Sequence, residues 1–195
     1  MQRTALIVID PQVGFCSREG SLAIDHGEHS LTNIQLALER IERFVESNEK
    51  LDVSLVVSEY SPGQFKDCGA MRNVCVPGAN LDCLVASTIL TDRANRIFLK
   101  RDESALSSPS FRDYVLELAR MSQWELLVCG FLTEHCVLQT VLGLNDLLGG
   151  QMELRCDLDM CGSRDTKYLQ TGLGSTSWAK ARMQASGIKV SYEEK

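Results

Sequence analysis

The 195-residue sequence predicts an α/β fold, with a three-layer α/β/α architecture around a mostly parallel, doubly wound sheet of about six strands. Two observations lead to this prediction. Short apolar runs recur along the chain, and most are continuous rather than alternating, which is typical of parallel strands covered on both faces. Segments with helical periodicity lie between these runs, so strands and helices alternate as in βαβ units with right-handed crossovers.

Six segments are the predicted strands. They are residues 4–9, 52–58, 95–99, 125–129, 152–156 and 188–192. The first reads TALIVI and the fourth reads ELLVC, both rich in the aliphatic and β-branched residues that favour strands. In a parallel sheet the functional site lies beyond the carboxyl ends of the strands, so the residues that follow each run are the candidates for function.

Four segments are the predicted helices. They are residues 31–48, 111–121, 134–148 and, interrupted by two glycines, about 165–185. In the first, apolar residues recur from Ile34 to Val45 at spacings of three and four, and Ser30 is a candidate N-cap. The segment 61–83 shows neither periodicity, and an irregular segment of this length usually covers or lines a site.

Composition limits the domain organisation and the partners. A chain of this length with 44% hydrophobic residues is expected to form a single domain over residues 1–195. A net charge of −6 argues against nucleic acid and anionic membrane surfaces as partners, which leaves a small-molecule substrate or another protein. The N-terminal run ALIVI is too short for a signal sequence or a membrane span, so we expect a cytoplasmic protein.

Eight cysteines and three histidines are available for disulfides or for zinc. No two cysteines form a CxxC pair, and a reducing compartment keeps thiols free. Neither a disulfide framework nor a structural zinc site is therefore favoured. Cys68, Cys75 and Cys83 fall in or at the end of the irregular segment, and redox sensing by these thiols is a separate hypothesis.

Three chemically distinct side chains follow predicted strands. Asp10 follows the first strand, Lys100 follows the third, and Cys136 comes shortly after the fourth. Each has an ordinary structural interpretation: a turn cap, a snorkelling surface lysine and a small buried hydrophobe, respectively. Together at one edge of the sheet they would supply a base, a positive charge and a nucleophile.

Cys136 lies in GFLTEHCVLQT, residues 130–140, where a predicted strand passes into a predicted helix. With Thr133 as the N-cap, Glu134 is the first helical residue and Cys136 the third. The helix dipole and the unpaired N–H groups of a first turn favour the thiolate form of a cysteine. The sequence therefore predicts an activated thiol at this position.

Four motifs in register resemble those of one superfamily. ALIVIDPQVGF is similar to an opening strand that ends in Asp-x-Gln, IFLKRDESAL to a lysine strand followed by Ser-Ala, GFLTEHCVLQT to a nucleophile segment, and CDLDMCGSRD to a strand that ends in Asp and is followed by Ser. On these motifs the chain resembles the isochorismatase-like cysteine hydrolases, the superfamily that contains nicotinamidase and N-carbamoylsarcosine amidohydrolase.

The resemblance implies a catalytic triad. Asp10 would take the thiol proton, Cys136 would attack a carbonyl carbon, and Lys100 would hold the acid and the developing charge. A thioester intermediate would follow and would be released by water.

The resemblance also implies the surroundings of this triad. The backbone N–H groups of Leu132 and Cys136 would form the oxyanion hole, and the peptide bond between Phe131 and Leu132 would be cis. Gln12, in a supporting role, and Phe15 would lie near the pocket. Relatives are commonly oligomeric, so a homo-oligomer is expected.

The chain departs from the nicotinamidases at their metal motif. Those proteins carry Asp-x-His after the second strand, whereas this chain reads SEYSPGQF and has no histidine between His29 and His135. We therefore expect no metal and no cofactor, and nicotinamide is not the favoured substrate. His135 is expected to pack or to support the site rather than to act as a second base.

Some other residues near the motifs have two interpretations. Lys66, Arg72 and Arg101 would either bind a carboxylate on the substrate or lie solvated on the surface. Cys129 and Cys161 are expected in the core.

The leading functional hypothesis is a metal-independent cysteine hydrolase that cleaves a C–N bond in a small amide, carbamoyl or ureide-like substrate. The alternative is a catalytically silent family member that acts as a binding or interaction protein. The alternative gains support because the segment SEYSPGQFKDCGAMRN differs from the better-known substrate loops of the superfamily.

Overall fold

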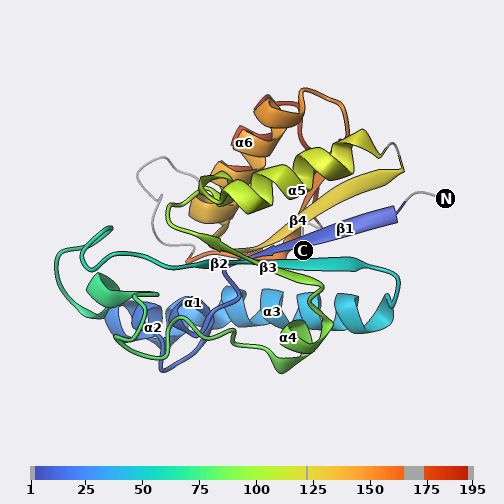
Figure 1. The fold of residues 1–195 in the computed structure, drawn as a ribbon. Coiled ribbons are helices and arrows are strands. Elements are labelled where there is room, and N and C mark those ends of the chain that lie inside the picture. Colours follow the sequence, from blue (N-terminus) through green and yellow to red (C-terminus); the bar gives the residue numbers. More distant parts are fainter. Residues whose placement is uncertain (1–2, 122, 165–173, 193–195) are drawn as a thin grey trace.

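The computed structural model describes residues 3–121, 123–164 and 174–192, which form one six-stranded sheet with helices on both faces (Figure 1). The strands are β1 (Arg3–Ile9), β2 (Asp52–Ser58), β3 (Arg96–Lys100), β4 (Trp124–Phe131), β5 (Glu153–Gly162) and β6 (Lys189–Ser191). Their order in the sheet is β3-β2-β1-β4-β5-β6, and every pairing is parallel. The predicted fold class is confirmed.

Helices cover the sheet on both sides. They are α1 (Val13–Cys16), α2 (Ser21–His26), α3 (Thr32–Ser47), α4 (Thr88–Arg93), α5 (Pro109–Arg120), α6 (Leu138–Leu148) and α7 (Ser175–Ala185), with 3-10 turns at Glu28–Leu31 (η1), Ala70–Asn73 (η2) and Ala105–Ser107 (η3) and a π-helical turn at Thr133–Val137 (η4). Figure 1 shows α5 and α6 on one face and α1 to α4 on the other. Within the described ranges, every helix is too short or too polar to span a lipid bilayer.

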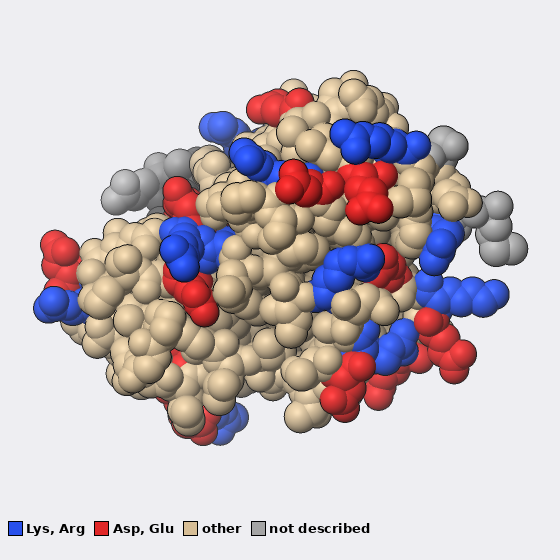
Figure 2. Space-filling model, in the orientation of Figure 1, with Lys and Arg blue, Asp and Glu red and all other residues tan. Residues whose placement is uncertain are grey.

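The core follows from the sequence patterns. Residues 5–9 of the central strand β1 are completely buried, as expected for a continuous apolar strand between two helical layers. Helix α3 turns one apolar face towards the sheet from Ile34 to Val45. On the face of the molecule that Figure 2 displays, acidic and basic side chains lie beside one another rather than in separate fields.

Two strands are longer than predicted. β4 continues through Gly130 to Phe131 rather than ending at residue 129, and β5 continues to Gly162 rather than ending at residue 156. In β5 the buried and half-buried positions alternate, so the acidic residues after 156 occupy its more exposed face while Leu158 and Met160 remain buried. The acidic residues obscured this strand in the sequence.

Helix boundaries show further differences. The short helices α1, α2 and α4 were not predicted, because segments of four to six residues carry too few positions to show a period. Ser30 does not cap α3: the N-cap position is Leu31, and the Ser30 hydroxyl donates a hydrogen bond to the Gly27 carbonyl. The helix predicted at about 165–185 corresponds to α7. Residues 165–173 of the predicted segment lie outside the described residues.

Gly130 allows the two central strands to remain together to their ends. It pairs with Ile9 of β1, and its φ angle is 119°. A Cβ atom on residue 130 would lie 2.2 Å from the Ile9 carbonyl oxygen, closer than any van der Waals contact. The glycine of the sequence motif is therefore required by the close approach of a neighbouring backbone.

Gly130→Ala should lower the free energy of unfolding by at least about 3 kcal/mol, because the methyl group would overlap the backbone of Ile9 and alanine disfavours a positive φ. Gly149→Ala is the matched control. Its φ is also positive, at 52°, but nothing lies within 4 Å of the new Cβ, so it should cost only about 1–2 kcal/mol. Urea unfolding measures both values, and equal losses would contradict the close-approach argument.

Candidate active site

The structure brings Asp10, Lys100 and Cys136 together at the carboxyl edge of the sheet. Lys100 Nζ lies 3.0 Å from Asp10 Oδ2 and 3.4 Å from Cys136 Sγ. Asp10 and Lys100 are fully buried, and Cys136 is 6% exposed. The strand order reverses between β1 and β4, which is where ligands bind in open α/β sheets.

Asp10 is held by its backbone and by β2. It follows β1 directly with a φ of 51°, a left-handed conformation that aspartate tolerates better than most residues. Its Oδ1 accepts a hydrogen bond of 2.8 Å from the Ser58 hydroxyl, so Oδ2 is left to face Lys100. The carboxylate is therefore fixed in orientation between two neighbouring strands.

Lys100 extends from β3 across β2 to reach Asp10. Its ammonium group also donates to the Tyr60 hydroxyl at 2.7 Å and to the Asp102 carbonyl at 3.0 Å. Burial by itself lowers the pKa of Lys100, but the charge of Asp10 and the contacts with Asp10 and the Cys136 sulfur outweigh burial and raise the pKa overall. The lysine is therefore a permanent cation within the site.

Cys136 lies in the π-helical turn that precedes α6, and two predictions about it are wrong. The N-cap position is Leu132 rather than Thr133, and Cys136 is the fourth residue of the turn. The thiol is not activated at rest: burial, together with the neighbouring Asp10, raises the pKa of Cys136 to about 12, and the opposing effects of Lys100 and Tyr60 do not cancel this rise. The resting sulfur is therefore a neutral thiol.

The residues before Cys136 form a special backbone. The peptide bond between Phe131 and Leu132 is cis. The N–H groups of His135 and Val137 both donate to the Leu132 carbonyl, at 3.0 and 3.2 Å, and the second bond spans five residues, as in a π-helix. The Leu132 N–H takes part in none of the backbone hydrogen bonds that the described residues form outside helices and strands.

Gln12 joins three segments behind the site. Its side-chain oxygen accepts from the Ser58 N–H at 2.6 Å, and its nitrogen donates to the carbonyls of Ser58 and Cys83 at 3.1 and 3.2 Å. Its amide therefore has backbone partners on both sides. Gln12 ties the end of β1 to the end of β2 and to the long loop.

A pocket of about 530 Å³ opens above Cys136, within the range of small-ligand sites. Its walls are formed by Phe15, His26, Tyr60, Phe65, Lys66, Met71, Val74, Glu103, Leu132, His135, Cys136 and Arg164. Most of this wall is apolar, and the charged residues include both signs. His135 Nδ1 lies 3.2 Å from Glu103 Oε1, so the histidine is engaged with a neighbouring carboxylate.

The irregular segment 61–83 forms one wall of the pocket, as its length predicted. Asp25 of α2 holds this wall: its carboxylate accepts from Lys66 Nζ at 2.9 Å and from the N–H groups of Ala70 and Met71 at 2.7 and 3.1 Å. Burial acts to raise the pKa of Asp25, but these donors outweigh it and lower the pKa. Of the three cations considered from sequence, Lys66 alone lines the pocket, and it is paired.

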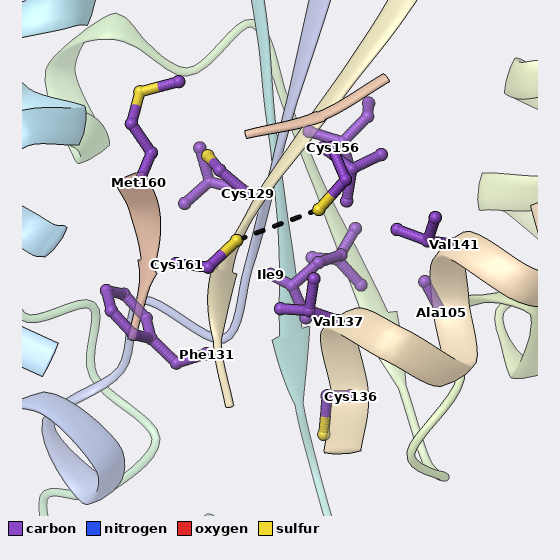
Figure 3. Close-up of a cluster of buried hydrophobic side chains, with 14 of the residues drawn as sticks. Ile9, Ala105, Cys129, Phe131, Cys136, Val137, Val141, Cys156, Met160 and Cys161 are labelled. Carbon is purple, nitrogen blue, oxygen red and sulfur yellow. Dashed lines mark hydrogen bonds between the residues drawn. The ribbon is translucent and has the colours of Figure 1, made fainter. Parts of the chain in front are cut away.

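All eight cysteines are free thiols. Cys129 and Cys161 lie in the core as predicted, and Cys161 Sγ is 4.0 Å from Cys156 Sγ. Figure 3 shows the sulfur of Cys136 pointing away from this buried group. In the long loop, burial raises the pKa of Cys75 and Cys83, which works against reaction of these thiols with peroxide.

Sequence reasoning missed Tyr60. Its hydroxyl lies 2.7 Å from Lys100 Nζ and 3.7 Å from Cys136 Sγ. The tyrosine is two residues beyond β2, in the stretch that was considered only for the metal motif it lacks. The available signal was its position after the carboxyl end of a central strand.

Among the described residues, no group of three or more His, Cys, Asp or Glu side chains is placed to hold a metal ion.

Fold and site together define an all-parallel α/β protein with a cysteine site at the carboxyl edge of its sheet. The model of the isochorismatase domain matches residues 4–186. The chain therefore belongs to the isochorismatase family, a family of hydrolases. No curated protein sequence is significantly similar to it.

Solved structures share the fold. PnC1 from L. infantum, solved in complex with nicotinate, has a TM-score of 0.71 and 16% identity over 97% of this chain and 92% of that chain. A nicotinamidase/pyrazinamidase of Acinetobacter baumanii has a TM-score of 0.70 and 21% identity over 98% and 96%. An isochorismatase hydrolase from Oleispira antarctica, described as putative, has a TM-score of 0.66 and 17% identity over 97% and 93%. At these identities the likeness concerns the fold.

The stability of the protein should fall at alkaline pH. Burial raises the pKa of Cys136 from its ordinary 9.0 to about 12, so the folded state holds the thiol proton more tightly than the unfolded state. The contribution of this thiol is fully present below about pH 9 and is lost as the pH rises towards 12, by about 1.4 kcal/mol per pH unit. Cys136→Ala should reduce the slope of the unfolding free energy against pH by about one proton, and Cys68→Ala, at an exposed thiol, should not. An unchanged slope in Cys136→Ala would show that the thiol does not titrate as described.

Asp25→Ala should loosen the wall of the pocket. The variant removes the acceptor of two loop N–H groups, so the amide protons of Ala70 and Met71 should exchange faster by about ten-fold or more, and stability should fall by about 1–3 kcal/mol. Hydrogen exchange followed by mass spectrometry measures the first effect. Asp67→Ala, in the same loop, is the control. Equal protection in the Asp25 variant and the wild type would mean that other contacts hold the wall.

Proposed function

We propose that this protein is a metal-independent cysteine hydrolase that cleaves a C–N bond in a small amide, carbamoyl or ureide-like substrate through a Cys136 thioester. The observation that carries the proposal is the position of Lys100 Nζ, 3.0 Å from Asp10 Oδ2 and 3.4 Å from Cys136 Sγ, at the bottom of a pocket. A nucleophile, a base and a buried cation in contact are the groups that acyl transfer requires.

The first half-reaction forms the thioester. Because the resting sulfur is a neutral thiol, Asp10 removes its proton as Sγ attacks the carbonyl carbon of the substrate. The carbonyl electrons move to oxygen, and the N–H groups of Leu132 and Cys136 are the proposed donors to this oxyanion. When the tetrahedral intermediate collapses, the C–N bond breaks, and Asp10 returns the proton to the departing amine or ammonia.

The second half-reaction releases the acyl group. Water gives a proton to Asp10 and adds to the thioester carbon. The C–S bond then breaks, the product leaves as a carboxylic or carbamic acid, and the sulfur takes the proton back from Asp10. Lys100 remains charged throughout, because its pKa is raised, and it offsets the negative charge that passes between Asp10 and Cys136.

The pocket supports a small substrate with an apolar portion. Phe15, Phe65, Met71, Val74 and Leu132 offer apolar contact area beside the sulfur. Several of the structural neighbours are nicotinamidases by name, yet SEYSPGQF lacks their metal motif, so nicotinamide is not the substrate we favour. The same proposal includes a homo-oligomer in the cytoplasm without a resident metal or cofactor and without nucleic-acid or membrane partners.

One observation favours a second candidate function. The raised pKa of Cys136 means that the thiol is not pre-activated. A neutral thiol of this kind is expected in a protein that has kept the scaffold and uses the pocket only for binding. In that case the pocket would hold a small molecule or a segment of a partner protein without turning it over.

Cys136→Ala should abolish hydrolysis of small amides, carbamoyl compounds and ureides, measured as ammonia release, because no nucleophile remains. Asp10→Asn should reduce the rate by about 10²–10⁴-fold, since it retains shape but removes the base. The thioester should appear in the wild type as an acyl mass on the Cys136 peptide that hydroxylamine removes.

Cys129→Ala, at a buried cysteine away from the pocket, is the control for the loss of a thiol. Turnover that survives in Cys136→Ala would contradict the mechanism. The absence of both turnover and acyl-enzyme in the wild type, together with measurable binding of the same compounds, would favour the binding protein.

A further inference from the structure

Tyr60 is fixed with its hydroxyl inside the site. The side chain leaves the chain just beyond β2, and the residue is 6% exposed. Its ring packs edge-on against Phe65, with the ring centroids 4.6 Å apart, and its N–H donates to the Cys75 carbonyl at 3.0 Å. The hydroxyl therefore has little freedom to leave its position between Lys100 and Cys136.

The donors of Lys100 are shared among more acceptors than they can serve. An ammonium group has three N–H donors. Four acceptors surround Nζ: the Tyr60 hydroxyl at 2.7 Å, Asp10 Oδ2 at 3.0 Å, the Asp102 carbonyl at 3.0 Å and Cys136 Sγ at 3.4 Å. The tyrosine is the nearest of the four and the sulfur the farthest. Since three donors face four acceptors, Lys100 cannot donate fully to all of them at once, and the sulfur has use for a further donor.

The direction of the hydrogen bonds at Tyr60 follows from this contact. Lysine can only donate, so the Tyr60 oxygen accepts from Lys100 and its own proton points elsewhere. The other hydrogen-bond partners of this hydroxyl are Cys136 Sγ, at 3.7 Å, and the Ser58 side chain, whose own proton is donated to Asp10. Burial, followed by the negative charge of Asp10, raises the pKa of Tyr60 far above its usual value, so the phenol keeps its proton.

We propose, on the basis of the hydrolase function above, that Tyr60 is a further catalytic residue: its hydroxyl accepts a hydrogen bond from Lys100 and donates one to Cys136 Sγ, and so stabilises the thiolate that forms when Asp10 removes the proton. The hydroxyl gives the sulfur a second hydrogen-bond donor beside Lys100, whose Nζ lies 3.4 Å from it. Hydrogen bonds strengthen when the acceptor becomes charged, so this bond contributes most as the thiolate develops.

No proton is transferred to or from Tyr60 at any step. The S–H bond breaks and the proton moves to Asp10, while the phenol O–H remains intact and only its hydrogen bond to sulfur shortens. In the second half-reaction the sulfur leaves the thioester with a negative charge, and the same hydrogen bond stabilises it as a leaving group. Tyr60 therefore acts in both halves of the cycle.

The test is the rate at which iodoacetamide alkylates Cys136 in the intact protein, followed across pH by mass spectrometry of the Cys136 peptide. Tyr60→Phe should slow alkylation by about three- to ten-fold at each pH below the pKa of the thiol, because the thiolate becomes rarer while its intrinsic nucleophilicity rises only in part. Tyr114→Phe is the matched control, since it removes a buried hydroxyl that binds Asp52, and it should alkylate as the wild type does.

A second variant separates hydrogen bonding from packing. Tyr60→3-fluorotyrosine keeps the ring and the hydroxyl but makes the hydroxyl a stronger donor, so alkylation should become faster, by about two-fold. A tyrosine that only fills space would not produce a faster rate. Unchanged alkylation in Tyr60→Phe, or slower alkylation in the fluorotyrosine variant, would overturn the proposal.

Amide hydrolysis by the same variants distinguishes this proposal from the proposed function. If the wild type hydrolyses amides and Tyr60→Phe alkylates normally, the role of Tyr60 is wrong and the hydrolase stands. If Tyr60→Phe slows alkylation but no variant hydrolyses any amide, donation from Tyr60 to the sulfur is supported and the hydrolase is overturned.

Discussion

The buried ion pair between Lys100 and Asp10 is the interaction on which the rest of the site depends. Each of these charges loses several kcal/mol of hydration when the protein folds, and the loss is offset by their attraction at 3.0 Å and by further hydrogen bonds. Ser58 supplies one of these bonds to the carboxylate, and Tyr60 and the Asp102 carbonyl accept from the ammonium group. These partners stand at or beyond the ends of three neighbouring strands. The register of the sheet therefore sets the distances between the charges of the site, and a shift in register would separate the ion pair.

The same burial that fixes the ion pair opposes the chemistry of the cysteine. A thiol surrounded by protein loses the hydration that would stabilise a thiolate, and the nearby Lys100 and Tyr60 do not replace that loss at Cys136. In the proposed mechanism the proton moves only from Cys136 to Asp10 while Lys100 stays charged. A neutral resting thiol is also protected from oxidants and stray electrophiles, which react with the thiolate.

The pocket wall and the bottom of the site are built from the same segment of chain. The long loop is attached to α2 through Asp25, to the end of β1 through Gln12, and to Tyr60 through the Cys75 carbonyl. Tyr60 and Gln12 therefore connect the pocket wall to the ends of β1 and β2, and Tyr60, directly before the loop, brings its hydroxyl within 3.7 Å of the sulfur.

The sequence by itself determined the fold class and three members of the site. Parallel topology follows from local periodicity, and it brings the carboxyl ends of strands to one edge, so Asp10, Lys100 and Cys136 could be grouped without a structure. Tertiary structure alone decided the full extent of β5, the neutral state of Cys136 and the place of Tyr60 within the site. These features depend on burial and on contacts between distant residues, since Tyr60 and Cys136 are 76 positions apart in the chain, and no local pattern encodes the loss of water around a side chain.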